Sequence, residues 1–219
     1  AILAKQINDT INKKSGQSYI CTFLNTGTEA VEAAIKHSYL TYRNKIKSHY
    51  QALENAFLNI ENYFSKYEID FKYNFNGKQY LSLDSFKRDL FKTNNNTIKR
   101  NKHKILASNN SFHGKTIGAL SVTANPKFRE SFLSDEQFGT LFFNWSKTEI
   151  EDYTTQNEYV FLLPKINTKG KIIIKKISQN SITAIIIEPI LGEGGIHVVP
   201  YDFLEFLRKT ATSHNIPLI

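Results

Sequence analysis

Several features that would narrow the choice of protein class are scarce or missing in this 219-residue chain. It contains one cysteine, Cys21, so an internal disulfide bond is excluded, as is typical of proteins in a reducing compartment. No apolar run approaches the roughly 20 residues of a membrane-spanning helix, and no signal-peptide pattern opens the chain. These absences predict a cytoplasmic protein without membrane partners.

Methionine is absent, the first residue is Ala1, and the last residues, "NIPLI", lie inside an apolar run. From these features we expect an excerpt of a longer protein. Hydrophobic residues make up 41% of the chain and aromatic residues 13%, which is typical of a globular protein. The length suffices for one large domain or two small ones.

Positive charge exceeds negative charge by 8, which raises the possibility of a nucleic-acid partner. Much of the excess falls in residues 87–104, around the stretch "KTNNNTIKRNKHK". Single-strand binders normally interleave aromatic with basic residues, and this stretch is rich in asparagine instead. We therefore favour a solvated basic loop and regard nucleic-acid binding as the weaker alternative.

The first and last parts of the chain have the pattern of an α/β protein. Residues 1–14 predict an amphipathic helix, "YICTFL" (19–24) a buried strand that contains Cys21, and residues 29–47 a helix with small residues on one side. From residue 104, "KILAS" predicts a strand, "YVFLLPKINTKGKIIIKK" two strands around a turn, and "ITAIIIEPI" a central parallel strand. An amphipathic helix after Pro200 and a strand beginning at "IPLI" complete the pattern.

Residues 49–103 have a different character and predict an insertion. Apolar residues from Tyr50 to Tyr67 recur at alternating spacings of three and four, which indicates a helix. "KYNFNGKQYL" predicts a hairpin at Asn76-Gly77, "LDSFKRDLF" a second helix, and the basic Asn-rich loop follows. We expect residues 1–48 and 104–219 to form the α/β domain, and a deletion of about 50–103 to leave it folded.

The turn Asn25-Thr26-Gly27-Thr28-Glu29 stands directly before a run of helix formers and has two interpretations. Thr26 or Thr28 can cap the helix, and Glu29 suits the positive end of its dipole. Alternatively, the glycine lets the backbone approach a phosphate, which the free N–H groups of a helix start can bind. This stretch alone favours the capping interpretation.

Two further stretches combine polar, aromatic and glycine residues after expected strands. They are Ser111-Phe112-His113-Gly114-Lys115-Thr116, and the segment from Glu188 to Gly195, which includes Glu193. Taken singly, each is explained by a core aromatic, a surface histidine, a solvated carboxylate or turn glycines. Together they suit one cofactor site with amides for a phosphate, an aromatic face for a ring, and carboxylates for its polar substituents.

Three motifs resemble those of the class III aminotransferases: "NTGTEAVEAAIK", "SFHGKTIGALSVTANPKFRESF" and "AIIIEPILGEGGIHVVPYDFLEFLRK". The resemblance covers about residues 1–48 and 104–219 in the family's order. It implies part of the large domain of the aspartate-aminotransferase-like fold, PLP fold type I. That fold has a mainly parallel sheet with helices on both faces, here with an inserted helix and hairpin element. The resemblance also implies pyridoxal 5′-phosphate as cofactor and a homodimer.

The resemblance implies a role for each site residue. Thr26, Gly27 and Thr28 match the turn that binds the cofactor phosphate. Phe112 matches the aromatic that stacks on the ring, with His113 and Gly114 completing its motif. Glu188 matches the glutamate beside the ring hydroxyl, and Glu193 the glutamate that gates the substrate-carboxylate pocket. Departures from the family pattern are Thr26 for serine and Leu191 for glutamine.

The implied reaction transfers an amino group from an ω-amino acid or diamine to a 2-oxo acid. In the family, the Schiff-base lysine and the aspartate at the ring nitrogen follow the strand that begins at "IPLI". We therefore expect both beyond Ile219, and expect this chain alone to be inactive. The alternative is a catalytically inactive relative that acts as a binding or regulatory module.

Overall fold

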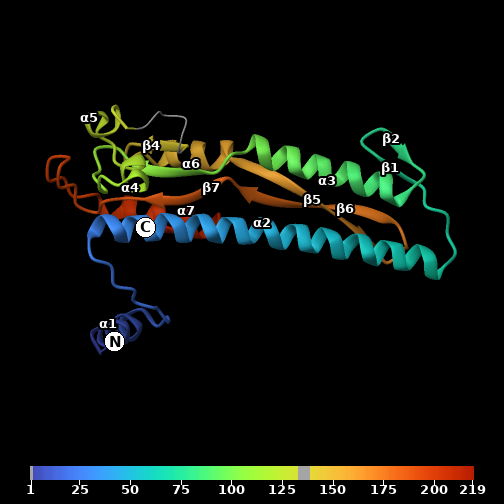
Figure 1. Ribbon diagram of the computed structural model, residues 1–219, viewed down its shortest axis with the longest axis horizontal. Helices are drawn as coiled ribbons and strands as arrows, with labels where there is room; N and C mark the ends of the chain where they lie inside the picture. The colour runs from blue at the N-terminus through green and yellow to red at the C-terminus, as the bar shows by residue number, and fades with distance from the viewer. Residues whose placement is uncertain (1, 133–138) are drawn as a thin grey trace.

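The computed structural model describes residues 2–132 and 139–219. Figure 1 shows an elongated molecule with a parallel sheet and its helices at one end and a helix–hairpin part at the other. In chain order the elements are α1 (Ile2–Ser15), α2 (Gly27–Lys66), β1 (Tyr73–Phe75), β2 (Lys78–Tyr80), α3 (Leu83–Arg100), β3 (Lys104–Ser108), α4 (Ile117–Ser121), α5 (Pro126–Arg129), β4 (Thr140–Phe143), α6 (Lys147–Gln156), β5 (Glu158–Ile166), β6 (Ile172–Asn180), β7 (Ile182–Ile186) and α7 (Tyr201–Ser213).

A parallel sheet with the strand order β4–β3–β7 forms the α/β part. Every residue of β7 is buried, as its continuous β-branched run predicted for a strand covered on both faces. On the free side of β7, Leu218 forms a parallel bridge with Ile185, and Ile219 donates its N–H to the carbonyl of Ile185 at 2.8 Å. The segment "IPLI" therefore pairs with β7 on the expected side of the sheet, but it forms a single bridge and not a named strand.

Helices cover both faces of this sheet. On one face, side chains of β3, β4 and β7 pack with α6 and α7; the buried residues include Leu106, Phe143, Ile150, Ile185, Phe203 and Leu207. On the other face, Ile105, Ala107, Ala184 and Ile186 contact Val31 and Ile35 near the start of α2. The α/β fold expected from the sequence, a mainly parallel sheet between helices, is confirmed.

The second part of the molecule consists of residues 49–100 and 158–180 and is called here the aromatic module. Its core combines α2, α3 and both hairpins; the buried residues are Leu53, Phe57, Ile60, Tyr80, Phe86, Leu90, Phe161 and Ile172. The β1–β2 hairpin turns at Asn76-Gly77 with φ values of 48° and 77°, as its Asn-Gly sequence predicted. Figure 1 shows β5 and β6 running between α2 and α3.

The domain boundaries expected from the sequence remain a prediction, but the packing bears on them. Residue 48 lies in the middle of α2, which continues without a break to Lys66 and not only to about Lys47. The antiparallel β5–β6 hairpin, expected in the α/β domain, packs in one core with the insertion 49–103. Among the described residues, no helix is both long and apolar enough to cross a membrane.

The buried strand expected at residues 19–24 is wrong. These residues form no strand, Ile20 is 92% exposed, and Cys21 is half-buried where a buried position was expected. An apolar run becomes a strand only when another strand supplies hydrogen-bond partners. In Figure 1 this segment and α1 stand clear of the body of the molecule.

The prediction of a basic, Asn-rich loop is also wrong, because α3 continues through this stretch to Arg100. Asn94, the first of three consecutive asparagines, is 1% exposed. Its side-chain amide donates to the carbonyl of Leu162 and accepts from the N–H of the same residue, both at 2.9 Å. A polar side chain is stable in this core because both of its groups are paired with one residue of β5.

Candidate functional site

The candidate site lies where the parallel strands end. The loops after β3 and β7 start from the carboxyl ends of neighbouring parallel strands, so they meet at one edge of the sheet. The start of α2 reaches the same place, since Thr28 contacts Gly114 in the loop after β3. We call these three segments, residues 25–29, 109–116 and 187–195, the carboxyl edge.

The turn before α2 forms a variant of the capping box, with the reciprocal bond one residue before the N-cap. Thr26 is the N-cap, and its hydroxyl accepts the N–H of Glu29 at 3.2 Å. In return the Glu29 carboxylate accepts the N–H of Asn25 at 2.8 Å. The capping interpretation is therefore confirmed, and it leaves the amides of Gly27 and Thr28, which lie in the first turn and have no intrahelical acceptor. Those amides can also bind an anion.

Gly114 allows the loop after β3 to touch α2. The residue is buried with a φ of 127°, and a Cβ atom at this position would overlap the side chain of Thr28. An alanine there would be strained in its backbone and would collide with the start of α2. The glycine thus fixes the distance between the two segments.

Thr123 fixes the backbone of His113, and burial lowers the pKa of its imidazole. The Thr123 hydroxyl accepts the N–H of His113 at 2.9 Å and donates to the carbonyl of Gly114 at 3.0 Å. Burial lowers the pKa of His113, although the nearby charge of Glu188 acts in the opposite direction. Its Nε2 atom is buried, and among the described residues it has no hydrogen-bond partner. Burial therefore favours the neutral form of the imidazole.

Glu188 connects the two loops through backbone amides. Its Oε2 atom accepts the N–H of Phe112 at 3.3 Å, and its Oε1 atom accepts the N–H of Gly192 at 3.2 Å. The Phe112 ring is half-buried and makes an edge contact with Phe128 at a centroid distance of 5.7 Å. The Glu188 carboxylate is thus held at the backbone of Phe112 and Gly192, which joins the loops after β3 and β7.

Glu193 differs from the other candidates. It lies one residue after Gly192, but its side chain is exposed and forms no hydrogen bond or ion pair within residues 2–132 and 139–219. Leu191 is buried beside it and lines a cavity of about 340 Å³ with Asn109, Asn110, Phe143, Asn144, Trp145 and His197. The structure therefore brings Thr28, Gly114, His113, Phe112 and Glu188 together and leaves Glu193 at the surface.

The contacts of two residues that support the site, Glu32 and Thr123, were not predicted from the sequence. Glu32 accepts the Thr116 hydroxyl at 2.6 Å and the amides of Gly118 and Ala119 at 2.8 and 3.2 Å, so it caps α4. Its position one helical turn after Thr28 was the available signal, since residues four apart share a helix face. Thr123 carried no comparable signal, because its partners lie in a loop that only the fold brings to it.

The arrangement suits an anion attached to a flat polar ring. First-turn amides and threonine hydroxyls are donors for the anion, a half-buried phenyl ring offers a face or edge for the ring, and Glu188 is an acceptor beside it. In the described part of the chain, no three His, Cys, Asp or Glu side chains form a group able to hold a metal ion.

A family model described as aminotransferase class-III matches residues 3–219. The chain belongs to this family. It is 30% identical over 122 residues to ornithine aminotransferase 1 of Staphylococcus saprophyticus, covering 56% of this chain and 25% of that protein. It is 37% identical over 118 residues to the mitochondrial acetylornithine aminotransferase of Candida glabrata, covering 54% and 23%. The matched part thus spans about a quarter of the length of these relatives.

The solved structures support the fold of this class III family member. The ornithine aminotransferase of Toxoplasma gondii, which contains PLP at partial occupancy in its active site, superimposes with a TM-score of 0.52. The alignment covers 98% of this chain and 33% of that protein at 16% identity. At this identity the likeness establishes the fold, PLP fold type I, as the sequence motifs implied.

Proposed function

We propose that the protein is a pyridoxal-phosphate-dependent aminotransferase and that the carboxyl edge binds its cofactor. The observation that carries the proposal is the contact between Thr28 and Gly114 next to the hydrogen bond between Phe112 and Glu188. These residues come from segments far apart in the sequence and match the family motifs one by one. Membership of the class III family supports the activity.

Each residue of the carboxyl edge has a proposed task. The amides of Gly27 and Thr28 and the Thr26 hydroxyl bind the phosphate, where the helix dipole favours negative charge. Phe112 covers one face of the ring and keeps water away from it. His113 and Glu188 face its polar substituents, with Glu188 oriented by the amides of Phe112 and Gly192. When bound, the cofactor supplies an electron sink for the substrate carbon.

The proposed donor is an ω-amino acid or a diamine, and the proposed acceptor is a 2-oxo acid. Relatives named ornithine, acetylornithine and putrescine aminotransferase support this substrate class. In this proposal the exposed Glu193 contacts the substrate carboxylate pocket and controls access to it. Because the Glu193 side chain is exposed, it is free to change its orientation when a substrate enters.

A homodimer is part of the proposal. The segment from α1 to the start of α2 exposes apolar side chains, including Leu3 at 58%, Ile20 at 92% and Phe23 at 54%. Such a surface is costly in water and suits a second subunit. A cytoplasmic location is also proposed, supported by the single cysteine. Light scattering and cell fractionation of the full-length protein test these two statements.

The test of the proposed function is titration of the full-length protein with pyridoxal phosphate, followed by a panel of amines. We expect the visible absorbance band of the protein-bound cofactor and consumption of a 2-oxo acid with ornithine-type or diamine donors. A band without turnover by any donor would favour the inactive binding module. Absence of the band at saturating cofactor would contradict the cofactor site itself.

A further inference from the structure

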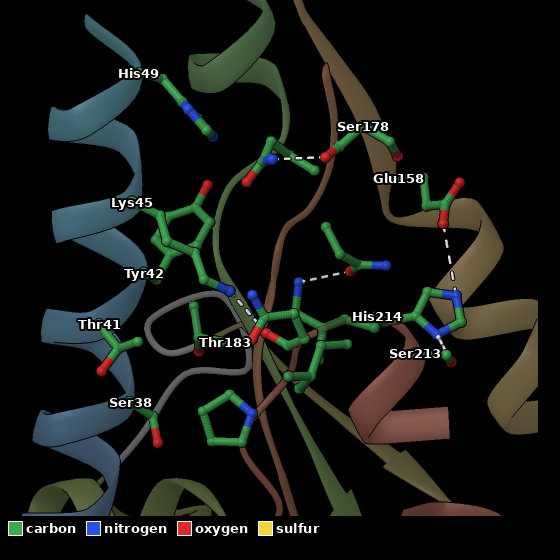
Figure 2. Close-up of a pocket in the computed structure, with 16 residues that line it drawn as sticks. Ser38, Thr41, Tyr42, Lys45, His49, Glu158, Ser178, Thr183, Ser213 and His214 are labelled. Carbon is green, nitrogen blue, oxygen red and sulfur yellow. Dashed lines mark hydrogen bonds and ion pairs between the residues drawn. The ribbon is translucent and has the colours of Figure 1, made fainter. Parts of the chain in front are cut away.

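A second cavity lies at the other end of the sheet, where β7 begins. It has a volume of about 340 Å³ and is enclosed by α2, the base of the β5–β6 hairpin, the first residues of β7 and the turn after α7 (Figure 2). It therefore touches both the α/β part and the aromatic module. Its size is within the range of small-molecule sites, about 300–1,000 Å³.

One face of α2 forms a wall of this cavity. Ser38, Thr41, Tyr42, Lys45 and His49 follow at spacings of three, one, three and four, so they lie on one side of the helix. Figure 2 shows Lys45 and His49 extending from α2 toward the opposite wall. An amphipathic helix that faced a protein core would carry apolar residues at these positions, so this polar face needs another explanation.

Within the part of the chain that the structure describes, Lys45 has no carboxylate partner. Its Nζ atom donates to the carbonyl of Asn215 at 2.7 Å and forms no ion pair within the described residues. Burial lowers its pKa, because the charged form loses water. The single hydrogen bond leaves two N–H donors of the ammonium group for an acceptor in the cavity.

His49 supplies a second unused group. Its Nε2 atom is buried and, among the described residues, lacks a hydrogen-bond partner. The ring lies 5.3 Å from that of Phe161, so it is held by packing and not by a polar contact. A buried polar atom without a partner is costly in free energy, and a ligand acceptor would remove that cost.

The carboxylate that lines the cavity is paired with His214 and not with Lys45, so the wall near Lys45 keeps a positive charge. Glu158 is the carboxylate in the wall, and its Oε1 atom lies 3.5 Å from Nε2 of His214. Figure 2 shows this pair on the side away from α2. The hydroxyl groups of Tyr42 and Tyr159 form a hydrogen bond of 3.0 Å, which connects α2 with the β5–β6 hairpin next to the cavity.

We propose that this cavity binds a small organic anion, with Lys45 and His49 binding its carboxylate or phosphate group. The ammonium of a lysine acts as a point charge, so it accepts either kind of oxyanion. The bound anion would contact α2, β7 and the hairpin base together, and would therefore stabilise the junction of the two parts. This site is separate from the carboxyl edge and does not depend on the proposed transamination.

The experiment is isothermal calorimetry on the full-length protein saturated with pyridoxal phosphate, with inorganic phosphate in one series and succinate in the other. Saturation keeps either anion out of the cofactor site. We expect one of the two anions to bind, and Lys45→Met to weaken that binding by about tenfold or more, since a hydrogen bond to a charged group is lost. Lys47→Met, two residues along α2 and exposed, is the matched control and should bind normally.

A second variant tests the proposal even if Lys45→Met does not fold. His49→Phe preserves the packing on Phe161 and removes the donor, so it should weaken binding several-fold. The proposal is overturned if neither anion binds at concentrations up to about 10 mM. It is also overturned if Lys47→Met weakens binding as much as Lys45→Met, or if His49→Phe leaves the affinity unchanged.

Discussion

The carboxyl edge and the aromatic module differ in the kind of side chain that they bury. In and around the carboxyl edge, buried hydroxyl groups are hydrogen-bonded: Ser111 donates to the carbonyl of Ser108 at 2.6 Å, and Thr123 bonds to His113 and Gly114 in the loop after β3. In the aromatic module, one ring is central. Phe86 contacts five other rings, with centroid distances of 4.9–6.2 Å.

The difference separates a region that fixes backbone positions from a region that fills volume. Hydrogen-bonded hydroxyls and a glycine contact hold the amides of the carboxyl edge in place, as a binding site requires. Packed rings supply a large buried area without such positional demands. We therefore expect changes in the aromatic module to lower stability and changes at the carboxyl edge to alter binding.

The largest expected effect comes from deleting one half of the aromatic module. The sequence led us to expect that a deletion of 50–103 would leave the α/β domain folded. From the packing we now expect this deletion alone to aggregate, because it uncovers Phe161, Ile172 and other apolar residues of the β5–β6 hairpin. Removing residues 159–179 as well, with a tight turn joining Glu158 and Asn180, should leave the α/β part with a cooperative unfolding transition. Thermal unfolding of both variants distinguishes the two cases. A well-folded single deletion would mean that the hairpin does not depend on the insertion.

Truncation of the central ring should have the next largest effect. Phe86→Ala should destabilise the protein by about 3–5 kcal/mol, as is typical for a fully buried phenylalanine. Leu58→Ala, in the same module but 54% exposed, should change stability by less than about 0.5 kcal/mol. Denaturant unfolding measures both values. Equal effects would show that Phe86 is not the centre of this core.

Asn94 offers a smaller test in the same module. Asn94→Ala leaves the N–H and the carbonyl of Leu162 without their side-chain partner, which should cost about 2–3 kcal/mol. Asn96→Ala, two residues away and exposed, should be nearly neutral. Unfolding of the two variants under identical conditions provides the comparison. A neutral Asn94→Ala would contradict the tertiary role of this side chain.

The smallest predicted effect concerns pH and the carboxyl edge. Burial lowers the pKa of His113 below its ordinary value of 6.5, so below that pH the unfolded state takes up a proton that the folded state does not. Stability should therefore fall as the pH drops below about 6.5, and His113→Gln should reduce that dependence. Burial also lowers the pKa of His103, so this residue adds to the loss of stability at low pH. Unfolding free energies between pH 7 and 5 test this, and an unchanged slope would contradict it.

Local patterns predicted several elements of the fold, whereas the roles of the candidate site residues remain predictions. The β-branched run of β7, the turn at Thr26 and the Asn76-Gly77 hairpin each depend on residues close in sequence, and the structure contains all three. The expected strand at 19–24 was wrong because a strand needs a pairing partner, and residues 19–24 have none among residues 2–132 and 139–219. Sequence alone did not reveal that pairing was absent.

Long-range partners account for what the sequence did not reveal. Asn94 is helical and buried because Leu162, 68 positions later, pairs with it. The cavity at Lys45 depends on Asn215, 170 positions away. Neither contact has a local signature, and the same holds for the packing of the β5–β6 hairpin against α3.

The most direct test of the cofactor site compares two glycines of positive φ in the full-length protein. Gly114→Ala would place a Cβ against Thr28, whereas Gly170→Ala would place one against Tyr63 in the aromatic module. Both changes should lower thermal stability, but only Gly114→Ala should weaken pyridoxal phosphate binding, by about tenfold or more, in a fluorescence titration. Unchanged affinity in the folded Gly114→Ala variant would contradict a cofactor site at the carboxyl edge.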